Sequence, residues 1–449
     1  MTAPIVPRSS TSPEPMLVRV LRPFQQFTHT EAAGGIVLLA CAAVALVWAN
    51  SPWAASYFHL WEATIGIRVG ERALDLSLHH WINDGLMAVF FFVVGLEIKR
   101  EMLVGELSTP RQAALPIAGA LGGMIVPAVI YATFNVGGPG APGWGIPMAT
   151  DIAFALGVLA LLGPRVPVVL KVFLTALAIA DDIGAVLVIA LFYTSELAFY
   201  WLLVGGGVLA ALIGLNVLGV RRPAAYLVLG ALLWLAFLKS GVHATVAGVV
   251  LAMTIPSRTR VHEEEFLQVA RGAIDEFDAA CQPGETVLTN RAQQEAVEAL
   301  EHVSEAVQSP LFTMERKLHG VVAFFIMPVF ALANAGVALG GLLDSLSLAV
   351  TSGVMLGLVL GKPIGITLFS WLAVRMGLAT LPAQTSWRAL HGVSWLGGIG
   401  FTMSLFIAGL AFADATLLDS AKVGILGASV VAGLAGWLML KSAMSMKGE

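Results

Sequence analysis

Five ionisable side chains lie inside long apolar stretches of the sequence, namely Asp84, Asp151, the adjacent pair Asp181 and Asp182, and Lys362. An ionisable group at the centre of a membrane helix costs about 2.5–3.5 kcal/mol on insertion scales, so such residues are functional hypotheses by default. Asp84 lies near one end of its apolar stretch, where a solvated or capping role competes with a transport role. The other four predict a charged site deep in the protein.

The acidic pair lies in the middle of ALAIADDIGAVLVIALF (176–192), which contains no basic residue. Successive helical residues point about 100° apart, so Asp181 and Asp182 must face different partners. The plainest structural interpretation is a buried pair that only neutralises Lys362 and holds helices together. One carboxylate would satisfy that need, so the second predicts ion binding.

Asp151 follows a proline-containing stretch, GWGIPMATDIAFALG. Pro147 removes a backbone donor and disfavours helix at the residue before it, which predicts an unwound segment at Ile146–Asp151. Non-helical backbone persists at membrane depth only when it is buried in protein or lines a water-filled cavity. Asp151 would either compensate the positive end of the following half-helix or coordinate a cation, and both roles stay open.

A second interruption is predicted in VSWLGGIGFTMSLFIAGL, where Gly397, Gly398 and Gly400 weaken the helix. Paired interrupted segments in two halves of a chain indicate a transport site between inverted repeats. The proposed repeats are 111–192 and 349–440, with three helices each. Lys362 precedes the second break and is placed to compensate carbonyl ends and to reach one of the paired aspartates.

The composition is that of a membrane protein rather than a soluble one. Hydrophobic residues make up 57% of the 449 residues and charged residues 12%, and the mean hydropathy is +0.84. Soluble domains carry roughly 25% charged residues. The net charge of −4 gives no case for nucleic-acid binding. Cys41 and Cys281 suggest neither a disulfide nor a metal site, and no cofactor is expected.

About twelve membrane helices are predicted, eight in 32–256 and four in 319–441, so the fold class is an all-α membrane protein. With the N-terminus inside, 20 of the 25 Lys and Arg residues are cytoplasmic, 4 are external and Lys362 is in mid-membrane. Both termini are therefore predicted to be cytoplasmic. Residues 1–31 form a tail with an amphipathic, interfacial stretch at 16–30, and 442–449 form a second tail.

Two pieces outside the membrane are predicted. Alternating polar and apolar residues around Gly70 and Glu71 indicate a small external β-hairpin at 62–78. Residues 257–318 form an acidic cytoplasmic loop with two helical stretches. It is either a solvated insert or a regulatory element.

Motifs along nearly the whole chain resemble the bacterial NhaA-type sodium/proton antiporters. The matching stretches are WIND (81–84), FFFVVGLEIKRE (90–101), ATDIAFALGVLALLG (149–163), ALAIADDIGA (176–185), LKSGVHATVAGV (238–249), FALANAGV (330–337), GKPIGI (361–366) and GIGFTMSLFI (398–407). The long 257–318 loop is a departure from compact members of the family. The resemblance implies exchange of cytoplasmic Na⁺ or Li⁺ for external H⁺ in the bacterial inner membrane, driven by the proton gradient.

The resemblance also implies roles for matched residues. Asp182 would be the principal cation and proton ligand, with Asp181 paired to Lys362, and both carboxylates would hold Na⁺ transiently. Thr150 and Asp151 would line the site where the broken helices cross. Five further residues match positions linked to pH response, namely Glu97, Arg100, His243, Glu315 and His319. A histidine such as His243 is, by itself, more often a packed, hydrogen-bonded residue than a pH switch.

A carboxylate binds either a proton or a sodium ion on the same oxygens, so the two ions compete, and either one lowers the cost of burying the charge. Two carboxylates allow more than one proton per cation, which would make exchange electrogenic. The sequence has no nucleotide-binding glycine loop, so an ion gradient is the expected energy source. The external hairpin is a candidate homodimer contact, and the lipid bilayer is the remaining partner.

Three rival functions remain to be separated by experiment. An intramembrane aspartyl protease would use Asp151 and Asp182 as a dyad, but the sequence lacks a GxGD-type motif and carries Lys362 nearby. A cation channel would need oligomeric pore rings. A degenerate family member would carry a different cation or serve only regulation.

Overall fold

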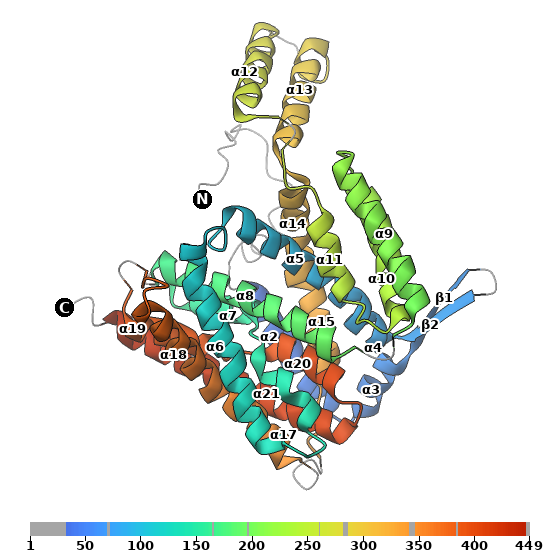
Figure 1. The fold of residues 1–449 in the computed structure, drawn as a ribbon. Coiled ribbons are helices and arrows are strands. Elements are labelled where there is room, and N and C mark those ends of the chain that lie inside the picture. Colours follow the sequence, from blue (N-terminus) through green and yellow to red (C-terminus); the bar gives the residue numbers. More distant parts are fainter. Residues whose placement is uncertain are drawn as a thin grey trace.

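Helices dominate the computed structural model, which describes residues 33–69, 72–163, 166–194, 197–259, 261–281, 286–340, 346–382 and 385–445 (Figure 1). The predicted interfacial stretch at 16–30 lies outside these residues. The first half contains α2 (Ala33–Ala49), α3 (Ala54–Glu62), β1 (Thr64–Val69), β2 (Arg72–Ser77), α4 (Leu78–His80), η1 (Trp81–Leu86), α5 (Met87–Val104), α6 (Pro110–Asn135), η2 (Ala141–Met148), α7 (Ile152–Leu161), α8 (Val168–Phe192), α9 (Phe199–Val217), α10 (Pro223–Ser240) and α11 (Val246–Thr254). The second half contains α12 (Glu263–Ala279), α13 (Arg291–Val307), α14 (Pro310–Val321), η4 (Val322–Ile326), α15 (Met327–Asn334), α17 (Leu348–Leu356), η5 (Gly357–Gly361), α18 (Lys362–Arg375), α19 (Trp387–Leu396), α20 (Phe401–Ala411) and α21 (Ala415–Ser445).

The described residues contain nine helices that are long and apolar enough to cross a membrane. The number rises to eleven if two bent pairs are each counted as one span, α2 with α3 (bent by 113°) and α19 with α20 (bent by 48°). Each of the twelve predicted segments contains a helix, but α11 has only nine residues. The chain is therefore a multi-pass helical membrane protein, while twelve spans and the inverted repeats stay predictions.

Both predicted helix interruptions are present in the structure. The 3₁₀-helix η2 ends at Met148, and α7 begins at Ile152 after three residues without helical structure. Likewise α19 ends at Leu396 and α20 begins at Phe401. Pro147 at the end of η2 and the glycines at 397, 398 and 400 are the local causes, because neither residue type sustains a regular helix.

Close packing of α6 on α18 holds the two halves of the molecule together. A Cβ atom added to Gly365 would lie 2.1 Å from the Gly122 carbonyl oxygen, and one added to Gly122 would lie 2.1 Å from the Gly365 carbonyl oxygen. Only residues without a side chain permit this approach, as in other glycine-lined membrane helix contacts. Because α18 begins with Lys362, the contact also sets where that lysine lies.

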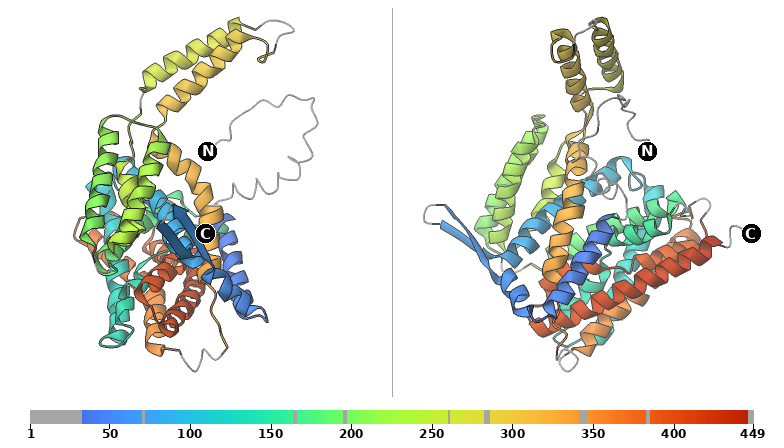
Figure 2. Two further views of the ribbon diagram at one scale, coloured as in Figure 1. Left: turned by 90° about the vertical axis from the view of Figure 1, so that its right-hand side faces the viewer. Right: turned by 180° about the vertical axis from the view of Figure 1, so that it is seen from behind.

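The pieces outside the helical body include a hairpin of strands and a hairpin of helices (Figures 1 and 2). Strands β1 and β2 pair antiparallel, with Thr64 opposite Ser77 and Val69 opposite Arg72. Helices α12 and α13 lie side by side and project away from the other helices, as both views in Figure 2 show. The two-stranded sheet confirms the predicted β-hairpin, and α12 and α13 fall within the two helical stretches predicted in the acidic loop.

Candidate functional site

The two helix breaks cross each other in the middle of the helical body. The Asp151 backbone N–H donates to the Ile399 carbonyl at 2.6 Å, and the Thr150 hydroxyl donates to the Gly397 carbonyl at 2.9 Å. These bonds satisfy carbonyl groups that α19 leaves free at its C-terminal end, as buried backbone requires. The crossing is thus held by hydrogen bonds from one break to the other.

Asp151 caps the N-terminal ends of both half-helices that leave the crossing. Its Oδ1 accepts from the Phe154 backbone N–H in α7 at 2.9 Å. Its Oδ2 accepts from the backbone N–H and the hydroxyl of Thr402 in α20, at 3.1 and 2.5 Å. A carboxylate stabilises the positive end of a helix dipole. This geometry fits the charge-compensating role, and cation binding by Asp151 stays a prediction.

Lys362 forms an ion pair with Asp181 inside the protein. Its Nζ lies 2.6 Å from Asp181 Oδ2 and donates a second hydrogen bond to Thr150 Oγ1 at 2.9 Å. The side chains of Lys362 and Asp181 are 1% and 2% exposed, so water does not screen the pair. The lysine follows the π-helix η5, a type of irregularity that is common at functional sites.

Asp182 faces a cavity instead of a partner. The residue is 3% exposed, and its Oδ1 is buried without a hydrogen-bond partner among the described residues. Asp182, Thr150, Asp151 and Thr402 line a cavity of about 510 Å³, which we call the central cavity. Adjacent carboxylates therefore have different surroundings, one paired with lysine and one at a cavity that is large enough for water and ions.

A charged cluster also lines the central cavity. It contains four of the residues that the resemblance linked to pH response, Glu97, Arg100, Glu315 and His319. Arg100 forms ion pairs with Glu315 and with Glu101, and His319 Nδ1 lies 3.7 Å from Glu97 Oε1. The Glu315 side chain is 9% exposed, and its Oε2 has no hydrogen-bond partner within the described chain.

His243 lies apart from that cluster, beside Asp84. Its Nε2 is 3.6 Å from Asp84 Oδ1, and its Nδ1 is 2.8 Å from the Thr245 hydroxyl. Its ring contacts Phe406 of α20 edge-on, with 5.5 Å between the ring centres. The structure thus separates the five predicted pH-response residues into two groups. The packed surroundings of His243 agree with its simpler interpretation, and its role as a sensor stays a prediction.

Sequence reasoning did not single out Thr402 and Ser404. The Ser404 hydroxyl donates to the Ile146 carbonyl at 2.7 Å, so both side chains of α20 bind the opposite break. The sequence does contain one indication of their role, because Thr402 and Ser404 follow shortly after the glycine break. Ser and Thr side chains commonly form hydrogen bonds with free backbone groups. Their partners are more than 240 positions away in the sequence, which no local pattern reveals.

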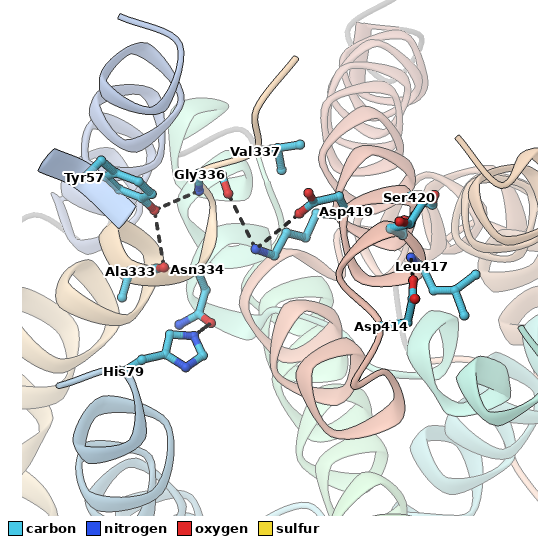
Figure 3. A network of polar contacts seen from close by, with 12 residues as sticks. Tyr57, His79, Ala333, Asn334, Gly336, Val337, Asp414, Leu417, Asp419 and Ser420 are labelled. Carbon is cyan, nitrogen blue, oxygen red and sulfur yellow. Dashed lines mark hydrogen bonds and ion pairs between the residues drawn. The ribbon is translucent and has the colours of Figure 1, made fainter. Parts of the chain in front are cut away.

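A second polar network, also not predicted, closes the far end of α15 (Figure 3). The Tyr57 hydroxyl donates to the Leu332 carbonyl at 2.8 Å and accepts from the Gly336 N–H at 3.1 Å. Lys422 of α21 lies 3.5 Å from the Gly336 carbonyl oxygen and 3.8 Å from Asp419 Oδ1. This network joins α3, α15 and α21, at the end of the α14–α15 span away from the helical hairpin.

Crossed helix breaks, a buried ion pair and a carboxylate facing a cavity define the class of protein as a membrane transporter. The family model described as "Na+/H+ antiporter 1" matches residues 25–440, and the chain belongs to this family. It is 52% identical over 431 residues to a protein named "Na(+)/H(+) antiporter NhaA" from Oleidesulfovibrio alaskensis, which covers 96% of each chain. Proteins with the same name from Koribacter versatilis and Acidithiobacillus ferrooxidans are 51% and 50% identical. They cover 94% and 96% of this chain, and 91% and 99% of their own lengths. These relatives are named as transporters rather than enzymes.

Proposed function

We propose that this protein exchanges Na⁺ or Li⁺ from the cytoplasm for external H⁺ across the bacterial inner membrane, with Asp182 as the ion-binding carboxylate. The observation that carries the proposal is the placement of Asp182, a buried acid that lines the central cavity and whose Oδ1 has no partner among the described residues. The names of the relatives supply the two ions.

The chemistry rests on the cost of an uncompensated charge. A bare carboxylate out of water is strongly disfavoured, whereas a protonated or sodium-bound carboxylate carries no net charge. Occupation by either ion therefore lowers the barrier to a conformational change that moves the site from one side to the other. An unoccupied site faces a higher barrier to this conformational change. The site therefore changes sides only with an ion bound, and the flows of Na⁺ and H⁺ are coupled.

While Lys362 is paired with Asp181, that carboxylate does not take part in the competition between Na⁺ and H⁺. Its ammonium lies 2.6 Å from Asp181, so that Asp181 is neutralised without an external ion. If Lys362 releases Asp181 during the cycle, a second proton can be bound, and exchange becomes electrogenic. The Glu97, Arg100, Glu315 and His319 cluster lines the same cavity as Asp182 and is the proposed origin of pH regulation.

Everted membrane vesicles test the proposal directly. After the interior is acidified by respiration, addition of Na⁺ or Li⁺ should collapse the proton gradient in vesicles that carry the wild-type protein. Asp182→Asn should reduce this response to that of vesicles without the protein. Asp419→Asn, which changes a carboxylate remote from the central cavity, should retain it. Full exchange by Asp182→Asn would rule out the ligand assignment.

The same assay separates the rival functions. A channel would dissipate a sodium gradient without moving protons, and a protease would give no ion response at all. Either result with properly inserted wild-type protein would end the antiporter proposal.

A further inference from the structure

A long apolar groove, separate from the central cavity, lies between η1–α5 on one side and α10–α11 on the other. Its volume is about 730 Å³, and its lining residues are all hydrophobic or glycine. Leu227 of α10 and Phe325 of η4 line it and are 48% and 55% exposed, so the groove is open to the surroundings of the protein. For the middle of a membrane-spanning helix, these surroundings are the hydrocarbon of the bilayer.

The groove is about as deep as one leaflet of a bilayer. Along η1 and α5 its lining runs from Trp81 to Phe92, a rise of roughly 15 Å. The hydrocarbon core of a bilayer is about 30 Å thick, so that each leaflet contributes about half of this depth. An apolar cavity excludes water, and an unfilled one loses dispersion contacts. Depth and chemistry therefore both favour an acyl chain as the occupant.

Three tryptophans line the end of this groove that is nearest to the β-hairpin. Trp81 Nε1 donates to the Ile65 carbonyl of β1, and Trp234 Nε1 donates to the Asp84 carbonyl, both at 3.0 Å. Trp61 is 8% exposed, and its Nε1 has no hydrogen-bond partner among the described residues. Tryptophan is enriched where the bilayer meets water, and a buried N–H without an acceptor is costly. This end of the groove thus calls for an acceptor at Trp61 that the described chain does not supply.

Trp61 also lines a smaller and more polar pocket of about 360 Å³. Ser77, the last residue of β2, lines this polar pocket, while Leu78, the next residue, lines the groove. The two hollows therefore meet at the base of the β-hairpin, on either side of Trp61. A molecule with an apolar chain and a polar head fits this combination.

The charged groups around the polar pocket are of both signs. Lys422 and Glu62 line it, and His79 lines it with its ring bound to an asparagine side chain inside the protein. Lys422 Nζ lies 3.8 Å from Asp419 Oδ1 (Figure 3), and the exposed Glu62 carboxylate lies 3.5 Å from His59. There is thus no excess of positive charge to hold an anionic head. Separate positive and negative groups instead suit a zwitterionic head, with its phosphate near Lys422 and its ammonium near Glu62.

We propose that the groove and the polar pocket together bind one zwitterionic phospholipid with a phosphoethanolamine head, from the leaflet on the hairpin side of the membrane. One acyl chain fills the groove. A glycerol-ester carbonyl, which lies between the chain and the phosphate of such a lipid, accepts the hydrogen bond from Trp61 Nε1. The bound lipid fills the space between α5 and α10 and so stabilises their packing. This site does not depend on the proposed ion exchange.

Native mass spectrometry of the protein purified in a mild detergent tests the binding. The wild type should retain one phosphatidylethanolamine per chain in preference to phosphatidylglycerol. Ala231→Phe should lose this lipid, because Ala231 is an exposed residue that lines the groove near the middle of α10. Ala210→Phe is the matched control, since Ala210 is exposed near the middle of α9 and does not line the groove. A wild type without lipid, a preference for phosphatidylglycerol or equal retention by both variants would overturn the proposal.

Trp61→Phe tests the hydrogen bond, because it keeps an aromatic ring and removes only the N–H donor. Titration of phosphatidylethanolamine into delipidated protein should show about three- to tenfold weaker binding, the scale of one hydrogen bond. Trp371→Phe in α18, which lines neither hollow, should bind like the wild type. Unchanged affinity in Trp61→Phe would overturn the proposed contact, and this titration decides alone if Ala231→Phe does not fold.

A second copy of the chain is the alternative occupant of the groove, and the same mass spectra report the oligomeric state. If Ala231→Phe separates the copies and leaves the lipid bound, a second copy covers the groove and the proposal is wrong. Thermal unfolding gives a further check. Added phosphatidylethanolamine should raise the melting temperature of the delipidated wild type and of Ala210→Phe but not that of Ala231→Phe. An equal rise in all three would contradict binding in the groove.

Discussion

At the scale of single residues, Asp181 and Asp182 show how neighbours in sequence acquire opposite environments. Asp181 Oδ2 is paired with Lys362 at 2.6 Å, whereas Asp182 Oδ1 has no hydrogen-bond partner among the described residues. The 100° turn between successive helical residues separates them. Removal of Lys362, the partner of Asp181, and removal of the Asp182 charge are therefore expected to have opposite effects on stability.

Lys362→Ala should destabilise the protein, because Asp181 would be left as a buried charge without compensation. Loss of one member of a buried pair typically costs about 3–5 kcal/mol. Thermal unfolding in detergent measures the effect. The double variant Lys362→Met with Asp181→Asn should recover much of the loss, and an unchanged melting temperature in the single variant would argue against the ion pair.

Asp182→Asn should leave the melting temperature unchanged or raise it, even though we expect it to abolish exchange. The substitution removes a buried charge whose Oδ1 has no partner, and so relieves a desolvation cost. The same thermal measurement checks it beside wild-type protein. Marked destabilisation would mean that Asp182 holds the fold together and is not kept for ions.

At the scale of secondary-structure elements, the crossing depends on half-helices that cap one another. Asp151 binds the ends of both α7 and α20, and Thr150 and Ser404 bind carbonyl groups across the crossing. Each bond satisfies a backbone or hydroxyl group that a continuous helix would satisfy internally. The breaks are stable because they occur as a pair.

Thr402→Val tests this mutual capping. The substitution keeps the shape and the backbone N–H bond but removes the hydroxyl that lies 2.5 Å from Asp151. We expect about 1–3 kcal/mol lower stability, since a buried carboxylate oxygen loses a donor. Thr402→Ser retains the hydroxyl and should behave like the wild type in thermal unfolding. Equal stability of the valine and serine variants would contradict the capping role.

Gly365→Ala tests the contact between α6 and α18. The new methyl group would lie 2.1 Å from the Gly122 carbonyl oxygen, so the helices must separate, at a typical cost of about 1–3 kcal/mol or more. Gly207→Ala in α9, where a Cβ meets nothing within 4 Å, should be neutral or slightly stabilising. Similar melting temperatures for both variants would mean that α6 and α18 adjust without strain.

At the scale of the whole molecule, the helical hairpin is a separate piece of structure. The buried side chains of α12 and α13, such as Ala273, Ala296 and Val303, belong to neither of the two hydrophobic clusters in the helical body. The Leu311 N–H donates to the Pro256 carbonyl at 3.2 Å, so the two ends of the insert meet at its base. The hairpin is therefore attached to the body through its ends.

Replacement of residues 258–308 by a short Gly/Ser linker should leave the helical body folded, with a melting temperature close to that of the wild type. The short distance between the ends makes closure of the linker inexpensive. Thermal unfolding and size-exclusion chromatography in detergent measure the outcome. Loss of a monodisperse protein would show that the insert is required for folding, and a change in pH response alone would support a regulatory role.

Much of the architecture could be predicted from local patterns. Apolar runs marked the helices, Pro147 and the glycines near 400 marked the breaks, and alternation marked the β-hairpin. Charges inside apolar runs pointed to Asp151, Asp181, Asp182 and Lys362. The 242–256 segment was already short for a membrane helix, and α11 in it has nine residues. Local patterns could not predict that Thr402 and Ser404 close the crossing, because that depends on partners from distant segments.

The sequence by itself determined that this is a membrane protein, where its helices break and which charged residues lie in apolar segments. Each of these follows from residue type and spacing along the chain. The tertiary structure decided which carboxylate is paired and which faces a cavity. It also decided that the five residues predicted to respond to pH fall into two separate groups. Hydrogen bonds and ion pairs act over a few ångströms, so only the arrangement of distant segments in space assigns their partners.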